Sequence, residues 1–177
     1  MVLGSGVAGT LGVLAQWAGL ADCLHGDTLV TMADRSKKKI KDVKVGEKIL
    51  NYNKGKLRVK TVLEVKESSS RTLRELLLQS ADGKEFTIKA TGGHPFYTKE
   101  KGWAVVSLDE GHFDKSKPVK ELTIGETLVV RGDAGAKLVR IGEASPTQRT
   151  YNLIIDGPGT FFAEGILSHS GLPPPKK

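Results

Sequence analysis

An internal repeat constrains the fold of this chain more than any other sequence feature. Residues 42–50 and residues 121–129 share a pattern of alternating apolar positions around a Gly-Glu pair, and their glycines, Gly46 and Gly125, lie 79 positions apart (125 − 46 = 79). A repeat of this kind indicates two related structural units. Each unit would bury its apolar face against the other, so the repeat predicts one compact domain built from two halves.

Two further matches keep nearly the same offset. Arg71 and Arg149 each begin an Arg-Thr-hydrophobic triplet, 78 positions apart (149 − 71 = 78). Both halves then reach a histidine, His94 and His169, 75 positions apart (169 − 94 = 75). The offset drifts by a few residues, as expected when loops vary in length and strands do not. Pseudo-symmetric halves bring equivalent loops together near their axis, so residues from both halves are predicted to converge there.

The local pattern beyond residue 23 predicts an all-β fold. Short runs rich in Val, Ile, Leu and Thr alternate with Gly, Asp and Asn turns, and no ten-residue stretch keeps helical periodicity well. Residues 80–83 predict a hairpin turn, because Asp-Gly tolerates positive φ. The predicted strands are Leu29–Met32, Lys48–Tyr52, Leu57–Val65, Thr72–Gln79, Glu85–Ala90, Trp103–Ser107, Thr127–Arg131, Leu138–Ile141, Tyr151–Ile155 and Thr160–Ala163.

Composition narrows the classes of partner and cofactor. The 177 residues carry a net charge of +7, but the basic residues are scattered and no aromatic residues interleave with them as a base-stacking surface requires. We therefore predict a solvated basic surface and no nucleic-acid partner. The single cysteine, Cys23, excludes an internal disulfide and a zinc site built from cysteine clusters. We predict no metal and no cofactor.

The segment before Cys23 is predicted to be an upstream flank. Residues 2–21 are uncharged and rich in Gly, Ala, Leu and Val, without the basic region of a secretory signal. Five glycines make this stretch a poor transmembrane helix, so we expect no stable membrane association. A lipoprotein processing site needs a small residue before the cysteine, and Asp22 is not one.

Three positions carry candidate chemistry: Cys23, the turn from Thr91 to His94, and His169. A cysteine with histidines distant in sequence is a candidate nucleophile, because catalytic groups are assembled in space. The Cys23 thiol would attack the carbonyl of Asp22 and convert the amide into a thioester. A histidine near the scissile nitrogen can donate a proton to it, and a threonine hydroxyl can hold the amide out of its relaxed geometry. The adjacent Asp22 carboxylate can speed loss of the upstream acyl group.

Three blocks of the chain resemble inteins and bacterial intein-like domains. Residues 23–30 resemble their N-terminal splicing block, and residues 91–97 resemble the block that holds a Thr-x-x-His pattern. Residues 151–169 resemble the C-terminal pair of blocks. The match spans residues 23–170, a length of 148 (170 − 23 + 1 = 148), which is similar to that of inteins without a homing endonuclease.

The resemblance implies a Hint domain, the fold that inteins share with hedgehog proteins. It implies an all-β horseshoe with pseudo-twofold symmetry over residues 23–170, flanked by the upstream segment 1–22 and a Pro-rich tail at 171–177. It also implies roles for Cys23 as the nucleophile, with Thr91, His94 and His169 as further catalytic residues. Inteins act within one chain, so a monomer is expected.

The C-terminal end departs from the intein pattern. Inteins end in His-Asn, and cyclisation of that Asn cuts the C-terminal bond, whereas Ser170 follows His169 here. Serine has no amide nitrogen for the ring, and the next residue, Gly171, offers no nucleophile. Asn152 stands where many inteins have Asp, and Gly159 where many have His. Splicing is therefore expected to fail.

The predicted function is single-turnover autocatalytic cleavage after Asp22, with the chain's own flanking polypeptide as substrate. Water or an external thiol or amine would release the upstream segment from the thioester; hedgehog domains use a sterol, for which this sequence has no binding extension. Alternatives are a splicing-competent domain trapped by an engineered Asn-to-Ser change at Ser170, a deletion of the Asn that leaves Ser170 as downstream nucleophile, and a catalytically silent β module. The cellular compartment is not determined by the sequence.

Overall fold

Fifteen β-strands and one short 3-10 helix make up the part of the chain that the structure describes, a computed structural model covering residues 22–110, 119–132, 134–157 and 159–170. The strands are β1 (Leu24–His25), β2 (Leu29–Thr31), β3 (Lys37–Lys39), β4 (Lys48–Asn53), β5 (Lys56–Arg71), β6 (Arg74–Gln79), β7 (Glu85–Ala90), β8 (Phe96–Thr98), β9 (Gly102–Val105), β10 (Lys120–Glu121), β11 (Thr127–Val129), β12 (Gly135–Ala144), β13 (Gln148–Ile155), β14 (Thr160–Ala163) and β15 (Ile166–His169). The helix η1 spans Ile40–Asp42.

The two halves of the predicted repeat form equivalent turns. Gly46 donates its N–H to the carbonyl of Val62 at 2.8 Å, and Gly125 donates its N–H to the carbonyl of Leu138 at 2.8 Å. Both glycines have positive φ, 90° and 95°, a conformation that residues with a side chain rarely adopt. The Gly-Glu pair of the repeat is therefore a matching structural turn in both halves.

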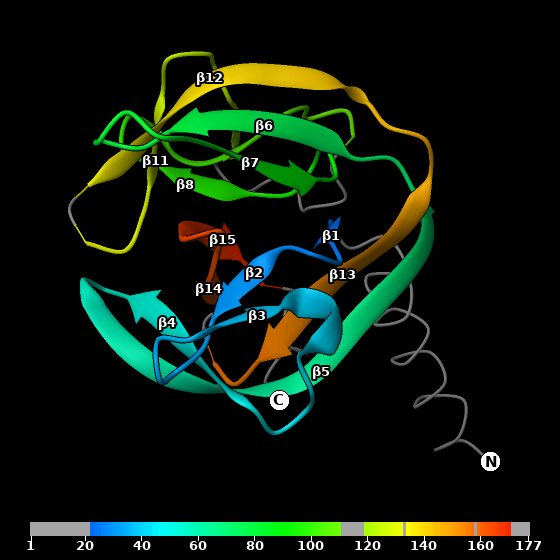
Figure 1. Cartoon of the computed structure of the whole chain (residues 1–177), viewed down its shortest axis with the longest axis vertical. Coiled ribbons are helices and arrows are strands. Elements are labelled where there is room, and N and C mark those ends of the chain that lie inside the picture. Colours follow the sequence, from blue (N-terminus) through cyan, green and yellow to red (C-terminus); the bar gives the residue numbers. More distant parts are fainter. Residues whose placement is uncertain (1–21, 111–118, 133, 158, 171–177) are drawn as a thin grey trace, which may run out of the picture.

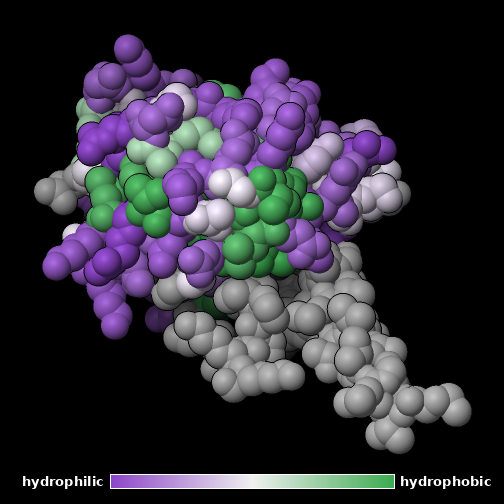
Figure 2. All heavy atoms as spheres, turned by 90° about the horizontal axis from the view of Figure 1, so that it is seen from below, coloured by the Kyte–Doolittle hydropathy of each residue, from purple (hydrophilic) through white to green (hydrophobic). Residues whose placement is uncertain are grey.

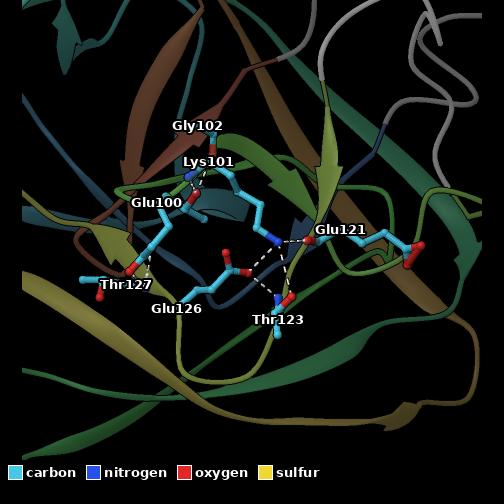
Figure 3. A network of polar contacts seen from close by, with 8 residues as sticks. Glu100, Lys101, Gly102, Glu121, Thr123, Glu126 and Thr127 are labelled. Carbon is cyan, nitrogen blue, oxygen red and sulfur yellow. Dashed lines mark hydrogen bonds and ion pairs between the residues drawn. The ribbon is translucent and has the colours of Figure 1, made fainter.

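The glutamates of the repeat also have matching surroundings. Glu47 accepts a hydrogen bond from the ammonium group of Lys38 at 2.6 Å. Its counterpart Glu126 pairs with Lys101 at 3.0 Å and accepts the backbone N–H of Thr123 (Figure 3). In both halves a lysine from a separate segment ties the turn to the rest of its half.

The halves are joined by exchanged pairing of their long strands. Each half contains a hairpin, β4 with β5 and β11 with β12. The long second strand then pairs with the other half, β5 antiparallel to β13 and β12 antiparallel to β6. Figure 1 shows these long strands curving around a closed side, with β6, β7 and β12 above and β2, β3 and β4 below. The result is the predicted all-β horseshoe with pseudo-twofold related halves.

The apolar core is built from side chains of strands in both halves. Its largest fully buried side chains include Phe96 on β8, Phe161 on β14 and Leu24 on β1. One cluster contains most of the buried apolar residues, and a smaller one contains Leu50, Phe162 and Leu167. The residues next to Cys23 are therefore fixed by contacts from both halves of the chain.

Each predicted strand overlaps a strand of the structure, but several observed strands were not predicted. The unpredicted strands are β1, β3, β8, β10 and β15. All five have two to four residues, too short for a clear alternating pattern. The predicted turn at residues 80–83 is confirmed, since Ser80 donates its N–H to the carbonyl of Lys84 at 2.8 Å and closes the β6–β7 hairpin.

The surface is mostly hydrophilic with some exposed apolar side chains. Figure 2 shows hydrophilic residues over most of the lower face and apolar residues gathered in two areas. Exposed large hydrophobic residues of the described chain include Val45, Leu57, Val59 and Leu63. No helix within the described ranges is long and apolar enough to cross a membrane. The predicted upstream flank, residues 1–21, and the tail, residues 171–177, lie outside the described residues.

Candidate active site

Cys23 lies immediately before the short strand β1, which sits between two strands from different parts of the chain. Leu24 pairs with Ala90 at the end of β7 on one side and with Tyr151 of β13 on the other. Because Thr91 follows Ala90 directly, this register brings Thr91 beside Cys23. The backbone N–H of Thr91 donates to the Cys23 carbonyl at 2.9 Å, which extends the pairing by one step.

The hydroxyl of Thr91 contacts both residues of the predicted scissile bond. The Cys23 N–H, which belongs to the Asp22–Cys23 amide, donates to Thr91 Oγ1 at 2.9 Å. The same hydroxyl donates to Asp22 Oδ1 at 3.3 Å. All three residues are buried. Thr91 thus lies where the sequence analysis expects it, in contact with the amide nitrogen.

His94 is fully buried at the end of the turn that Thr91 begins. Its backbone N–H donates to the Thr91 carbonyl at 3.0 Å, and its Nε2 lies 2.5 Å from Ser168 Oγ. Its Nδ1 makes no hydrogen bond of ordinary geometry. The Asp22 main chain nevertheless lies close to the ring and by itself would raise the pKa of His94. Burial dominates and lowers the pKa of His94 to about 3, with a smaller contribution from His169. The ring is therefore neutral at physiological pH.

The carbonyl oxygen of the same peptide bond also has a side-chain donor. Asn152 Nδ2 donates to the Asp22 carbonyl oxygen at 2.7 Å, and both residues are buried. Asn152 Oδ1 accepts the backbone N–H of Leu153 at 2.8 Å. The Asp22–Cys23 peptide is thus hydrogen-bonded on its nitrogen side by Thr91 and on its oxygen side by Asn152.

The environment of the Cys23 thiol opposes ionisation. Burial raises the pKa of Cys23 to about 11, while a hydrogen bond with the Thr150 side chain and the charge of Arg71 lower it. Asp22 adds a small upward contribution. Arg71 Nη2 lies 3.7 Å from Asp22 Oδ1, so the guanidinium also forms an ion pair with the upstream residue.

Strand β15 brings the C-terminal end of the domain next to His94, because Ser168 on this strand contacts the His94 ring. His169 Nδ1 lies 2.6 Å from the carbonyl oxygen of Ser170, and its ring packs edge-on against Trp103 at a centroid distance of 5.1 Å. Ser170 is buried and donates its N–H to the carbonyl of Gly159 at 2.8 Å. His169 therefore contacts the carbonyl of the Ser170–Gly171 bond, the position at which the resemblance places the C-terminal cut of inteins. The other partner in that bond, Gly171, lies outside the described residues.

The structure brings most of the predicted residues together and adds three that sequence analysis did not identify. Thr91 and Asn152 hydrogen-bond to the Asp22–Cys23 peptide, and His94 lies near the Asp22 main chain; Ser168, Thr150 and Arg71 are the additional side chains. Thr150 and Arg71 belong to the matched triplets of the repeat, which is the one signal that pointed to them. Ser168 has no such signal, because it is a small residue inside a hydrophobic strand. In the described ranges no cluster of three or more His, Cys, Asp or Glu side chains could hold a metal ion.

The Hint-domain family model matches residues 22–131, which contain the cysteine and the Thr91–His94 turn. The chain belongs to the Hint-domain family. No curated protein matches the sequence.

Solved structures extend the likeness across both halves of this Hint domain. A variant of the Ssp DnaB mini-intein is similar at a TM-score of 0.66 and 24% identity, covering 86% of this chain and 96% of the other. A DnaB intein from Synechocystis has a TM-score of 0.65 at 25% identity and covers 86% and 100%. A bacterial intein-like domain from Clostridium thermocellum has a TM-score of 0.60 at 22% identity and covers 84% and 97%. These similarities confirm the predicted Hint fold.

Proposed function

We propose that this Hint domain cleaves its own chain after Asp22 through an N–S acyl shift at Cys23. The observation that carries the proposal is the hydrogen bond from the Cys23 N–H to Thr91 Oγ1 at 2.9 Å, which places a buried hydroxyl on the nitrogen that must leave. The proposed boundaries are an upstream segment at residues 1–22, the processing domain at 23–170 and a tail at 171–177. The reaction is single-turnover and requires only one chain.

Thr91 assists departure of the Cys23 nitrogen in this proposal. An amide nitrogen is a poor leaving group until it is protonated, and protonation makes its N–H a stronger donor. The bond to Thr91 Oγ1 therefore strengthens as the C–N bond breaks. An interaction that is stronger in the transition state than in the ground state lowers the barrier.

His94 supplies the proton on the other side of the same bond. If Ser168 Oγ donates to Nε2, the neutral ring carries its proton on Nδ1, and the Asp22 main chain lies near the ring. The thiol loses its proton to solvent before the attack, and the neutral imidazole donates from Nδ1 to the leaving nitrogen and regains a proton from solvent. The low pKa of His94 follows from its burial, and the neutral form of the ring predominates at neutral pH.

Cys23 reacts slowly in this environment. With a pKa of about 11, only a small fraction of the thiol is ionised at neutral pH. The hydrogen bond with Thr150 and the charge of Arg71 lower the pKa of the thiol and so reduce the cost of forming the thiolate. Once the thioester has formed, water or an external thiol or amine attacks the Asp22 carbonyl and releases the upstream segment.

Splicing stops at the C-terminal bond in this proposal. Ser170 is buried and His169 Nδ1 lies 2.6 Å from its carbonyl oxygen, so a group that could polarise the carbonyl is in contact with it. The serine side chain has no amide nitrogen to form the cyclic product that cuts this bond. The N-terminal reaction is therefore the one that this chain retains.

Intact-mass measurement tests the proposal directly. The purified chain would be incubated with and without a small thiol or hydroxylamine, beside a Cys23→Ala variant. We expect loss of residues 1–22, accelerated by either nucleophile and absent in the variant. An unchanged mass over days, from neutral to alkaline pH, would contradict the proposal and favour a silent β module.

A further inference from the structure

We propose that Asn152 is a catalytic residue that stabilises the oxyanion formed on Asp22 during attack by Cys23. This inference rests on the proposed N–S acyl shift and assigns it a hydrogen-bond donor. By sequence, Asn152 is only a departure from the intein pattern. In the structure its side chain lies on the reacting carbonyl.

The geometry specifies which atom of the amide meets the carbonyl. Asn152 Oδ1 accepts the backbone N–H of Leu153 at 2.8 Å, so the oxygen of the side chain is already engaged. Its Nδ2 must then point the other way, where it donates to the Asp22 carbonyl oxygen at 2.7 Å. Asn152 is 3% exposed and Asp22 8% exposed, so water competes little for this bond.

The reaction places charge on the oxygen that Asn152 contacts. Cys23 Sγ forms a bond to the Asp22 carbonyl carbon, and the carbonyl electron pair moves onto its oxygen. When the carbonyl re-forms, the C–N bond breaks and the Cys23 amino nitrogen takes a proton, which balances the proton that the thiol released to solvent. A fixed donor in a buried site interacts more strongly with the negatively charged oxygen than with the carbonyl of the ground state. Being neutral, Asn152 performs this role at every pH.

Two substitutions at Asn152 distinguish loss of the hydrogen-bond donor from loss of the folded structure. Asn152→Ala removes the donor, and loss of one such donor typically lowers the rate about 100- to 1,000-fold. Asn152→Asp keeps the size of the side chain and an acceptor for the Leu153 N–H, but an ionised carboxylate cannot donate. We expect both variants to form thioester slowly at neutral pH, measured as nucleophile-induced loss of residues 1–22.

Asn51 offers a matched control. It is a fully buried asparagine on β4 whose Nδ2 donates to a backbone carbonyl, that of Thr160, at 2.7 Å. Asn51→Ala therefore removes the same kind of buried bond away from the scissile carbonyl. We expect this variant to cleave at the parent rate at a temperature where it is folded.

The pH dependence distinguishes a donor from a structural residue. A protonated Asp can donate to the oxyanion, so the ratio of the Asn152→Asp rate to the Asn152→Ala rate should rise as the pH falls. Dividing the two rates cancels the common dependence on the Cys23 thiol. A ratio that stays constant with pH, in variants that remain folded, would overturn the inference.

A measurement independent of cleavage completes the test. In an uncleavable Cys23→Ala chain, we expect the carbonyl ¹³C resonance of Asp22 to shift when Asn152 is changed to Ala and not when Asn51 is. If the parent fails to cleave but this shift is seen, the proposed function is wrong and the contact stands. If the parent cleaves and Asn152→Ala cleaves equally fast, the oxyanion role is wrong and the proposed function stands.

Discussion

Nε2 of His94 lies 2.5 Å from Oγ of Ser168, and both side chains are fully buried. This contact links the turn that holds Thr91 to strand β15, which leads to the C-terminal end of the domain. A hydroxyl that donates to Nε2 leaves the ring proton on Nδ1. With the hydroxyl as donor, the direction that the proposed function requires, the pair sets which nitrogen of His94 serves the Asp22–Cys23 bond.

Removing the Ser168 hydroxyl should slow processing through His94. In Ser168→Ala the Nε2 atom loses its partner, and the Nδ1–H tautomer is no longer favoured. We expect thiol-induced cleavage to fall by at least about tenfold, but by less than the roughly 100- to 10,000-fold expected for loss of the general acid in His94→Ala. Nitrogen chemical shifts of His94 report the tautomer. Unchanged shifts in the variant would show that Ser168 does not set it.

Thr91 provides a second test with a close isostere. Thr91→Val keeps the shape of the side chain but removes the oxygen that accepts the Cys23 N–H. A hydrogen bond to a group that becomes charged contributes about 1.5–3 kcal/mol, which corresponds to a roughly 10- to 100-fold slower reaction. Thr91→Ser retains the hydroxyl and should remain close to the parent. Equal rates in the Val and Ser variants would exclude the proposed role.

The rate of thioester formation should rise with pH without a downturn from His94. Below a pKa of about 11, each pH unit increases the Cys23 thiolate about tenfold. A fall at high pH would require loss of a protonated histidine. Burial lowers the pKa of His94 to about 3, so the ring is already neutral throughout this range.

Cleavage measured between pH 6 and 9.5 checks this dependence. Hydroxylamine should be in sufficient excess that the observed rate no longer depends on its concentration, so that thioester formation limits. A bell-shaped profile centred near neutral pH would contradict a neutral His94. A flat profile would indicate adventitious cleavage.

Asparagine at position 170 should restore C-terminal cleavage. Ser170→Asn supplies the side-chain amide that can cyclise onto its own carbonyl, where His169 Nδ1 is already in contact at 2.6 Å. We expect release of residues 171–177 in this variant by intact mass, and none in Ser170→Ala. Adding His169→Ala to the asparagine variant should abolish the cut. No cleavage in Ser170→Asn would indicate that the differences at Asn152 and Gly159 prevent it.

The repeat and the intein-like blocks could be recognised in the sequence because they depend on local residue types. Gly46 and Gly125 mark turns that need positive φ, and the alternating apolar residues around them predict strands. The exchange of β5 and β12 between the halves could not be predicted in the same way. It depends on which strand edges meet after the chain folds back, and periodicity within one strand contains no information on its partner.

The sequence by itself determined the all-β class, the two-half organisation and the identity of Cys23, Thr91 and His94 as candidate reacting groups. Only the tertiary structure decided what surrounds them. Asn152 meets Asp22 across 130 positions of sequence, and His94 meets Ser168 across 74. Hydrogen-bond partners and burial at such separations arise only when both halves pack together. The same packing makes His94 neutral and the Cys23 thiol weakly acidic, because removal of water disfavours the charged form of each.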